Sequence, residues 1–262
     1  MSNILRSVVL FVSTTLLFGC DPVPKQHYLL DDPVSWHVNE TGDKNTYAYL
    51  NLENEQFGEA SYTWLPALSD QRTPPPDFGN IDYLVEENNF DTQADGFLRA
   101  RFFGQTEDGS WILYGFQTKG GTYWIKNTDD NSYGISYLPT DIITNESSTA
   151  VDGTIISCID QVCNNNVGNI GYTIYYDGIA TKTTPVADFD THNFVTKGSI
   201  HISTLNEDFS ITFTEWLSIY PPLGVVHRIL TQGALDDAID VEMKLSKTNI
   251  DTSAFTTDIS TP

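Results

Sequence analysis

Basic residues are scarce in this sequence. The 262 residues include 13 lysines and arginines against 35 aspartates and glutamates, which gives a formal net charge of -22 at pH 7. Proteins that bind nucleic acids use clusters of Lys and Arg to neutralise phosphates, so we expect no nucleic-acid partner. The acidic residues are spread along the chain rather than gathered in a tail. Such a surface keeps a protein soluble in a salty medium, and it could also attract cations.

The sequence also lacks the common local motifs of catalysis and cofactor binding. It contains no GxSxG elbow, P-loop or GxGxxG pattern, and its five histidines form no HxH or HExxH pair. His192 and His201 are an odd number of residues apart, so one unbroken strand would place them on opposite faces. We therefore expect no cofactor and no metal, assign no catalytic residue, and favour a protein that is not an enzyme. A pair of glycosidase carboxylates stays open, because two such acids need only be close in space.

The longest apolar run near the start of the chain is too short for a membrane-spanning helix. Arg6 is followed by the apolar segment Ser7 to Phe18 and then by the small residue Gly19. A charged end, an apolar core and a small residue at the cut are the parts of an export signal. The core has about 12 residues, whereas a spanning helix needs about 20. Residues 1–19 are therefore predicted to be a cleaved signal peptide.

The end of this segment, Leu17-Phe18-Gly19-Cys20, resembles the lipobox of bacterial lipoproteins. The resemblance implies that Cys20 is lipidated on sulfur, becomes the new N-terminus and joins the protein to a membrane. It further implies a place in the bacterial cell envelope, facing the periplasm or the cell exterior. Phe18 departs from the family, which usually has a smaller residue there. Asp21 resembles a retention signal for the inner membrane, but that rule varies between bacteria and the choice of membrane stays open.

Only two further cysteines occur, Cys158 and Cys163. An even pair in an exported protein is typical of a disulfide. Their CxxxxC spacing is not that of a zinc site or of a redox-active CxxC motif. We predict a structural disulfide between them, with two free thiols as the main alternative.

Runs of aromatic and β-branched residues alternate with Gly, Asp and Asn turns through most of the chain. This pattern is typical of antiparallel strands. We predict a mainly β protein, an antiparallel meander that forms a curved sheet, half-barrel or sandwich with little helix. The best helical candidates are short, Ile81 to Glu87 and Ala234 to Ile239.

Proline clusters and polar stretches suggest the divisions of the chain. The predicted units are a lipidated tether at 20–35, a small β section at 36–76, a main antiparallel β domain at 77–247 and a flexible tail at 248–262.

The segment Thr184 to Leu245 resembles a set of poorly characterised bacterial envelope lipoproteins. It has a Pro/Phe turn near Pro185 and a later layout of Trp216, Pro221-Pro222 and Gly224-Val225-Val226. Ala187-Asp188 stands where that family tends to have a glycine turn. The resemblance implies a curved sheet and carries over no catalytic residue. Independently of it, the two prolines must end a strand and Gly224 permits the turn that starts the next one.

These observations predict an envelope lipoprotein whose extracytoplasmic β domain binds an unidentified envelope protein or a small apolar ligand. The alternative is a surface carbohydrate-binding module or glycoside hydrolase. Trp111 and Trp124 are the weak candidates for ligand contact, since tryptophans on a wetter sheet face could stack on sugar rings. Packing in the core is the competing interpretation for both.

Overall fold

The computed structural model describes residues 25–26, 40–52, 55, 57–66, 74–79, 81–90, 99–106, 109–118, 120–145, 147–159, 162–204, 208–221, 223–234 and 237–250. The predicted signal peptide, Cys20, most of the predicted tether and residues 251–262 lie outside these ranges. Within the described ranges, no helix is long and apolar enough to cross a membrane.

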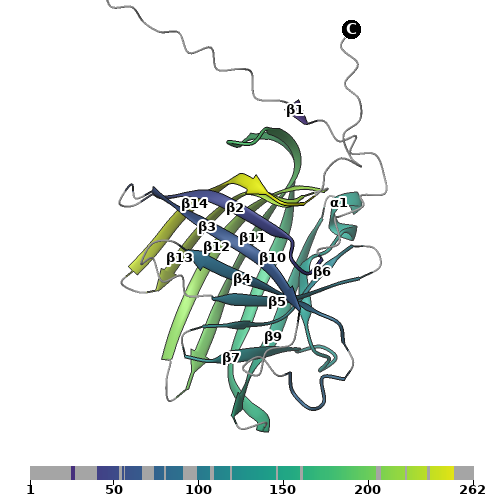
Figure 1. The fold of residues 1–262 in the computed structure, drawn as a ribbon. Helices are drawn as coiled ribbons and strands as arrows, with labels where there is room; N and C mark the ends of the chain where they lie inside the picture. Colours follow the sequence, from purple (N-terminus) through teal and green to yellow (C-terminus); the bar gives the residue numbers. More distant parts are fainter. Residues whose placement is uncertain are drawn as a thin grey trace, which may run out of the picture.

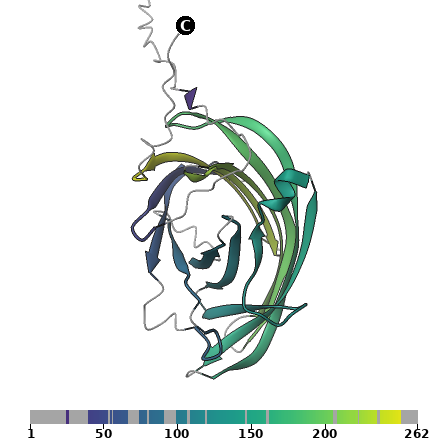
Figure 2. The same ribbon diagram turned by 90° about the vertical axis from the view of Figure 1, so that its right-hand side faces the viewer.

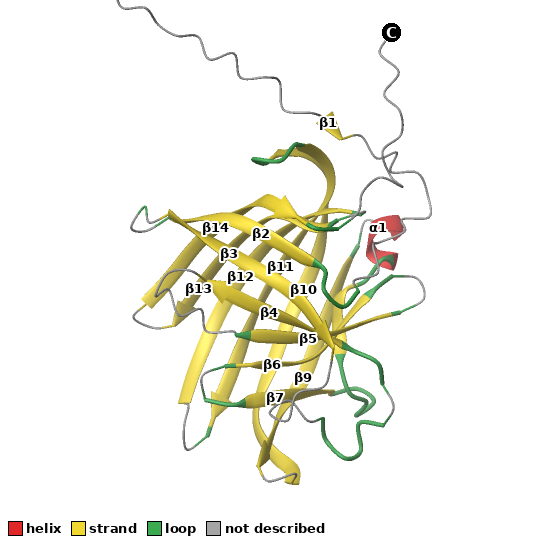
Figure 3. Ribbon diagram, in the orientation of Figure 1, coloured by secondary structure: helices red, strands yellow, loops and turns green. Residues whose placement is uncertain are grey.

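Strands make up nearly all of the regular structure in the described residues, and α1 is the one helix among them (Figures 1 and 3). The elements are β1 (Lys25–Gln26), β2 (Lys44–Asn51), β3 (Phe57–Pro66), β4 (Leu84–Phe90), β5 (Ala100–Gln105), β6 (Trp111–Gln117), β7 (Thr122–Asn127), β8 (Ile135–Leu138), α1 (Asp141–Asn145), β9 (Ser148–Ile159), β10 (Val162–Thr183), β11 (Asp188–Ser203), β12 (Asp208–Tyr220), β13 (Gly224–Ala234) and β14 (Asp237–Thr248).

Twelve of these strands form a closed antiparallel barrel. The hydrogen-bonded order runs β11-β10-β9-β7-β6-β5-β4-β3-β2-β14-β13-β12, and β12 pairs back with β11. Figure 2, a view turned by 90° from Figure 1, shows the wall curving round on itself. Two short strands stand outside this circuit, because β8 pairs with the first half of β6 and β1 pairs in parallel with β11. The mainly β, antiparallel prediction is confirmed, and closure of the sheet is more specific than the predicted curved sheet, half-barrel or sandwich.

The barrel has an inner and an outer face because side chains alternate along each strand. On β12 the inward row is Ile211, Phe213, Glu215, Leu217 and Ile219, whereas Trp216 points outward and is 37% exposed. The predicted corner after β12 is present, since β12 ends at Tyr220 and β13 begins at Gly224. Gly224 has a φ of 76°, a left-handed conformation that glycine adopts without steric cost.

Both predicted helical segments are wrong. Most of the first lies in β4, which pairs with β3 and β5. Of the second, Ala234 ends β13 and residues 237–239 begin β14, which pairs with β13. Apolar runs this short do not separate helix from strand by period alone, and pairing within the sheet decides. The N-terminal section predicted at 36–76 supplies β2 and β3, which join the same barrel through β14 and β4.

Three apolar clusters pack against the wall. The largest fills much of the barrel interior and includes Trp64, Trp111 and Phe194. A second fills the end near the β10–β11 and β12–β13 connections and includes Phe189 and Tyr220. The third, around Phe102, lies on the opposite face of the sheet from the first, where Phe78 and Tyr83 pack on Trp124 of β7. The interior is thus largely occupied by the protein's own side chains, and one cavity lies among them.

Candidate functional site

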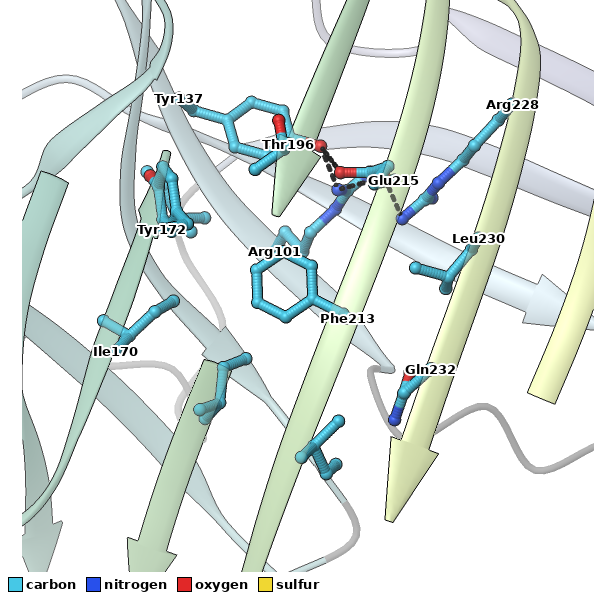
Figure 4. A pocket seen from close by; sticks show the side chains of 13 residues that line it. Arg101, Tyr137, Ile170, Tyr172, Thr196, Phe213, Glu215, Arg228, Leu230 and Gln232 are labelled. Atoms are coloured by element: carbon cyan, nitrogen blue, oxygen red, sulfur yellow. Dashed lines mark hydrogen bonds and ion pairs between the residues drawn. The ribbon is translucent and has the colours of Figure 1, made fainter. Parts of the chain in front are cut away.

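A polar cluster crosses the interior of the barrel. Arg101 Nε donates to Glu86 Oε2 at 2.7 Å, and Arg101 Nη1 donates to the Tyr137 hydroxyl at 2.7 Å. The Tyr137 hydroxyl in turn donates to Glu215 Oε2 at 2.8 Å. Arg228 Nη2 forms an ion pair with Glu215 Oε1. Five side chains from β4, β5, β8, β12 and β13 therefore form one continuous network that ties opposite sides of the wall together, and Figure 4 shows four of them, Arg101, Tyr137, Glu215 and Arg228.

The strand register explains how these residues meet. Glu215 and Thr196 are direct cross-strand partners, and Arg228 faces Leu217, one inward position further along β12. Thr196 and Arg228 thus flank Glu215 from the two neighbouring strands. Glu86 and Arg101 are likewise direct partners across β4 and β5. Each member occupies a position whose parity directs its side chain inward.

Burial and mutual attraction set the charges of the cluster. Burial lowers the pKa of Arg101, but Glu86, Tyr137 and Glu215 outweigh it, and the net direction is well upward. The pKa of Arg228 is also raised, because Glu215 and Tyr62 outweigh the effect of burial. Burial raises the pKa of the Tyr137 phenol. Both guanidinium groups are therefore cationic and the phenol is protonated at neutral pH.

A cavity lies directly against this cluster (Figure 4). It holds about 70 Å³ of free space and is partly open to solvent, which is smaller than the roughly 300–1,000 Å³ of common ligand sites. Its lining is Arg101, Leu113, Tyr137, Ile170, Tyr172, Thr196, Ile200, Ile211, Phe213, Glu215, Arg228, Leu230 and Gln232. Most of these side chains are apolar, and the charged ones all belong to the cluster. The cavity therefore has an apolar wall and one polar boundary.

Three buried polar atoms of lining residues have no hydrogen-bond partner, Arg228 Nε, Thr196 Oγ1 and Glu215 Oε1, although the last forms an ion pair with Arg228 Nη2. Arg228 uses its other nitrogens, because Nη1 donates to the Tyr62 hydroxyl at 3.1 Å and Nη2 pairs with Glu215. Thr196 is 1% exposed and Arg228 is 7% exposed. Buried polar groups normally form hydrogen bonds, and a buried group that lacks one costs about 1–3 kcal/mol of stability. These atoms belong to residues of the cavity lining, and the protein itself leaves them without a hydrogen bond.

Neither candidate tryptophan lies in this lining. Trp111 is 5% exposed and packs edge-to-face on Trp64, with ring centroids 5.5 Å apart. Trp124 is fully buried on the other side of the wall, where its ring centroid lies 5.0 Å from that of Phe102. Both are core residues, so neither presents an open platform for a sugar ring.

The other residues singled out in the sequence are dispersed. His192 is buried and His201 is exposed on the same strand, as the odd spacing predicts. In the described part of the chain, no three His, Cys, Asp or Glu side chains are arranged to hold a metal ion. Cys163 is disulfide-bonded, but the Cys158 side chain lies outside the described residues, so that pairing stays a prediction. Glu215 has both carboxylate oxygens engaged, which leaves it poorly suited to act as a glycosidase acid.

Sequence reasoning missed the polar cluster, although one signal of it is present. Glu215 shares the parity of Phe213 and Leu217, so an acid interrupts the apolar face of a strand. Arg228 likewise interrupts the inward row of Val226 and Leu230. A charge at an apolar position marks a buried polar site, but the pattern along one strand does not reveal which other strands supply its partners.

No family model matches the sequence, and no curated protein matches it significantly. A Bacteroides fragilis protein, assigned as exported and as having a YmcC-like fold, has a TM-score of 0.44 and 13% identity, covering 82% of this chain and 99% of that one. A Parabacteroides distasonis protein, assigned as a lipoprotein, has a TM-score of 0.38 and 12% identity, covering 83% of this chain and 100% of that one. Likenesses below a TM-score of 0.5 transfer no function, so any assignment rests on the residues of this chain.

Proposed function

We propose that this protein is a lipid-anchored, non-enzymatic component of the bacterial cell envelope whose barrel binds a small, largely apolar ligand. The observation that carries the proposal is the cavity in the barrel interior, with apolar side chains along its wall and a buried polar cluster at its boundary. Apolar pockets with a few convergent polar groups are the usual form of small-molecule sites.

The energetics of the interior favour binding over a purely structural role. An unfilled apolar cavity costs packing energy, and buried ion pairs repay their desolvation only in part. A barrel that served only as a spacer would be more stable with its interior filled by apolar side chains. Here the wall leaves space beside Arg101, Glu215 and Arg228 instead. A ligand that occupies the space would recover the lost contacts.

The proposed anchor would join the barrel at a defined end. Lys25 and Gln26 of β1 pair with Asp188 and Phe189 at the start of β11. Cys20 precedes Lys25 by five residues, which span at most about 18 Å when fully extended. The lipid would therefore hold this end of the barrel close to the membrane.

Along β13, the cavity lining runs from Arg228 through Leu230 to Gln232, toward the end of the strand opposite Gly224.

A blocking substitution tests the site. Leu230 lines the cavity, so Leu230→Trp should fill part of the space. The adjacent Thr231 faces the other side of the wall, and Thr231→Trp adds the same ring outside the cavity. The uncharged fluorophore N-phenyl-1-naphthylamine should bind the purified protein and the Thr231→Trp variant with increased emission, and it should bind Leu230→Trp at least about tenfold more weakly.

Far-ultraviolet circular dichroism of both variants provides the folding control. Equal binding of the fluorophore by folded Leu230→Trp and Thr231→Trp proteins would contradict the cavity as the site. Absence of binding to the unsubstituted protein would remove the proposed function itself.

A further inference from the structure

The charges around the cavity cancel. Glu86 is paired with Arg101 and Glu215 is paired with Arg228, so two formal positive charges face two formal negative charges. Glu215 also lies 3.8 Å from Arg101, between Oε1 and Nη1, which links the two pairs. The remaining lining residues carry no charge. No cation in the lining is therefore left without a partner for an anionic ligand.

Two of the open polar atoms, Arg228 Nε and Thr196 Oγ1, indicate a different kind of partner. Arg228 Nε has one hydrogen to donate, whereas the Thr196 hydroxyl can either donate or accept. A ligand hydroxyl or carbonyl oxygen could accept a hydrogen bond from either atom, and a hydroxyl could also donate to Thr196 Oγ1. Either group would bring polar atoms to this boundary without adding a charge.

The apolar part of the lining extends away from these atoms. Ile170, Ile200 and Ile211 come from adjoining strands, and Leu230 follows Arg228 on the inner face of β13. In Figure 4 the labelled apolar side chains surround the space next to the cluster, and Gln232 lies beyond Leu230 along the strand. A hydrocarbon chain could lie along this wall with its polar end at Thr196.

We infer that the ligand is an uncharged amphiphile, a hydrocarbon chain with a hydroxyl or carbonyl head group held by Arg228 Nε and Thr196 Oγ1. This inference rests on the proposed function and adds the chemical class of the ligand. A fatty acid would bring an extra carboxylate into a region whose charges already cancel, and a buried charge without a partner is costly. The formal charge of -22 on the whole chain also opposes an anion.

Displacement of bound N-phenyl-1-naphthylamine distinguishes the two kinds of head group. 1-Decanol and decanoate have the same chain length, and decanoate is ionised at pH 8. 1-Decanol should displace the fluorophore at a concentration at least about tenfold lower than decanoate does. Displacement by decanoate at an equal or lower concentration would overturn the inference while leaving the proposed function in place, because the cavity would still bind an apolar ligand.

Thr196→Val tests where the head group lies. The substitution keeps the side-chain shape and removes a hydroxyl that has no partner in the protein, so the fold should be retained. 1-Decanol should bind this variant about fivefold more weakly, while hexylbenzene, which has no head group, should displace the fluorophore equally from both proteins. Thr212→Val, on the exposed face of β12, is the matched control. It should change neither the binding of 1-decanol nor that of hexylbenzene. Unchanged binding of 1-decanol by Thr196→Val would overturn the inference.

Discussion

Removal of one arginine from the interior should destabilise the barrel strongly. Arg228 and Glu215 form an ion pair, and their side chains are 9% and 4% exposed. In Arg228→Met, Glu215 would keep its hydrogen bond from Tyr137 but lose its nearest cation, leaving Arg101 Nη1 at 3.8 Å. Removing one partner of a buried pair typically costs about 3–5 kcal/mol. We expect the free energy of unfolding, measured in urea, to fall by about that amount.

A double variant separates the loss of charge balance from the loss of packing. Glu215→Gln in addition to Arg228→Met removes both charges and retains an amide near Tyr137. The double variant should therefore be more stable than the sum of the two single effects predicts, with a coupling of about 1–3 kcal/mol.

A lysine on the outer face provides the control. Lys244 is 42% exposed and lies 3.1 Å from Glu242, so Lys244→Met should cost no more than about 1 kcal/mol. Strict additivity of the interior pair, or a cost for Arg228→Met as small as for Lys244→Met, would refute the reasoning.

Three further predictions concern the anchor, the pH dependence and the wall. Cys20→Ala should abolish lipid labelling of the protein, and labelling that persists in this variant would exclude Cys20 as the attachment site. Burial lowers the pKa of His192 from 6.5 to about 4, so its contribution to stability is intact above pH 6.5 and is lost as the pH falls toward 4. His192→Gln should flatten this part of the stability profile in urea titrations, and an unchanged slope would contradict the lowered pKa. A Cβ on Gly198 would collide with the Gly171 carbonyl oxygen and Tyr172, whereas one on Gly233 meets nothing closer than 3.8 Å. Gly198→Ala should therefore lower the free energy of unfolding by about 1–3 kcal/mol and Gly233→Ala should not, and equal effects would be evidence against that contact.

The local parts of the fold follow from patterns along the chain. The predicted mainly β, antiparallel character is present, and the predicted corner at Pro221-Pro222 and Gly224 lies between the end of β12 and the start of β13. Such features depend on neighbouring residues, so alternation and turn residues are enough to find them.

Closure of the barrel depends on contacts between distant residues. Residues Asn45 to Asn51 of β2 pair with residues Val241 to Thr248 of β14, close to the other end of the chain. Alternation within either strand does not identify its partner, so the same pattern fitted an open sheet and a barrel equally well. The short helix α1 also escaped prediction, because a segment of five residues has too few positions to show a helical period.

The candidate site depends both on local patterns along a strand and on contacts between distant residues. The inward parity of Glu215 could have been noticed from its strand, but its contacts with Tyr137 and Arg228 come from β8 and β13. Trp111 and Trp124 drew attention as large aromatic residues on strands, yet their burial depends on the closed wall and on the cover formed by Phe78 and Tyr83. A cavity is space left between side chains of many strands, and no local pattern encodes it.

Titration of the purified protein with N-phenyl-1-naphthylamine, with and without Leu230→Trp, tests the central claim most directly. The account predicts saturable binding of one fluorophore per chain, displacement by 1-decanol, and loss of binding when the tryptophan occupies the cavity. Saturable binding that is unaffected by Leu230→Trp in a correctly folded variant would place the ligand elsewhere and contradict the account.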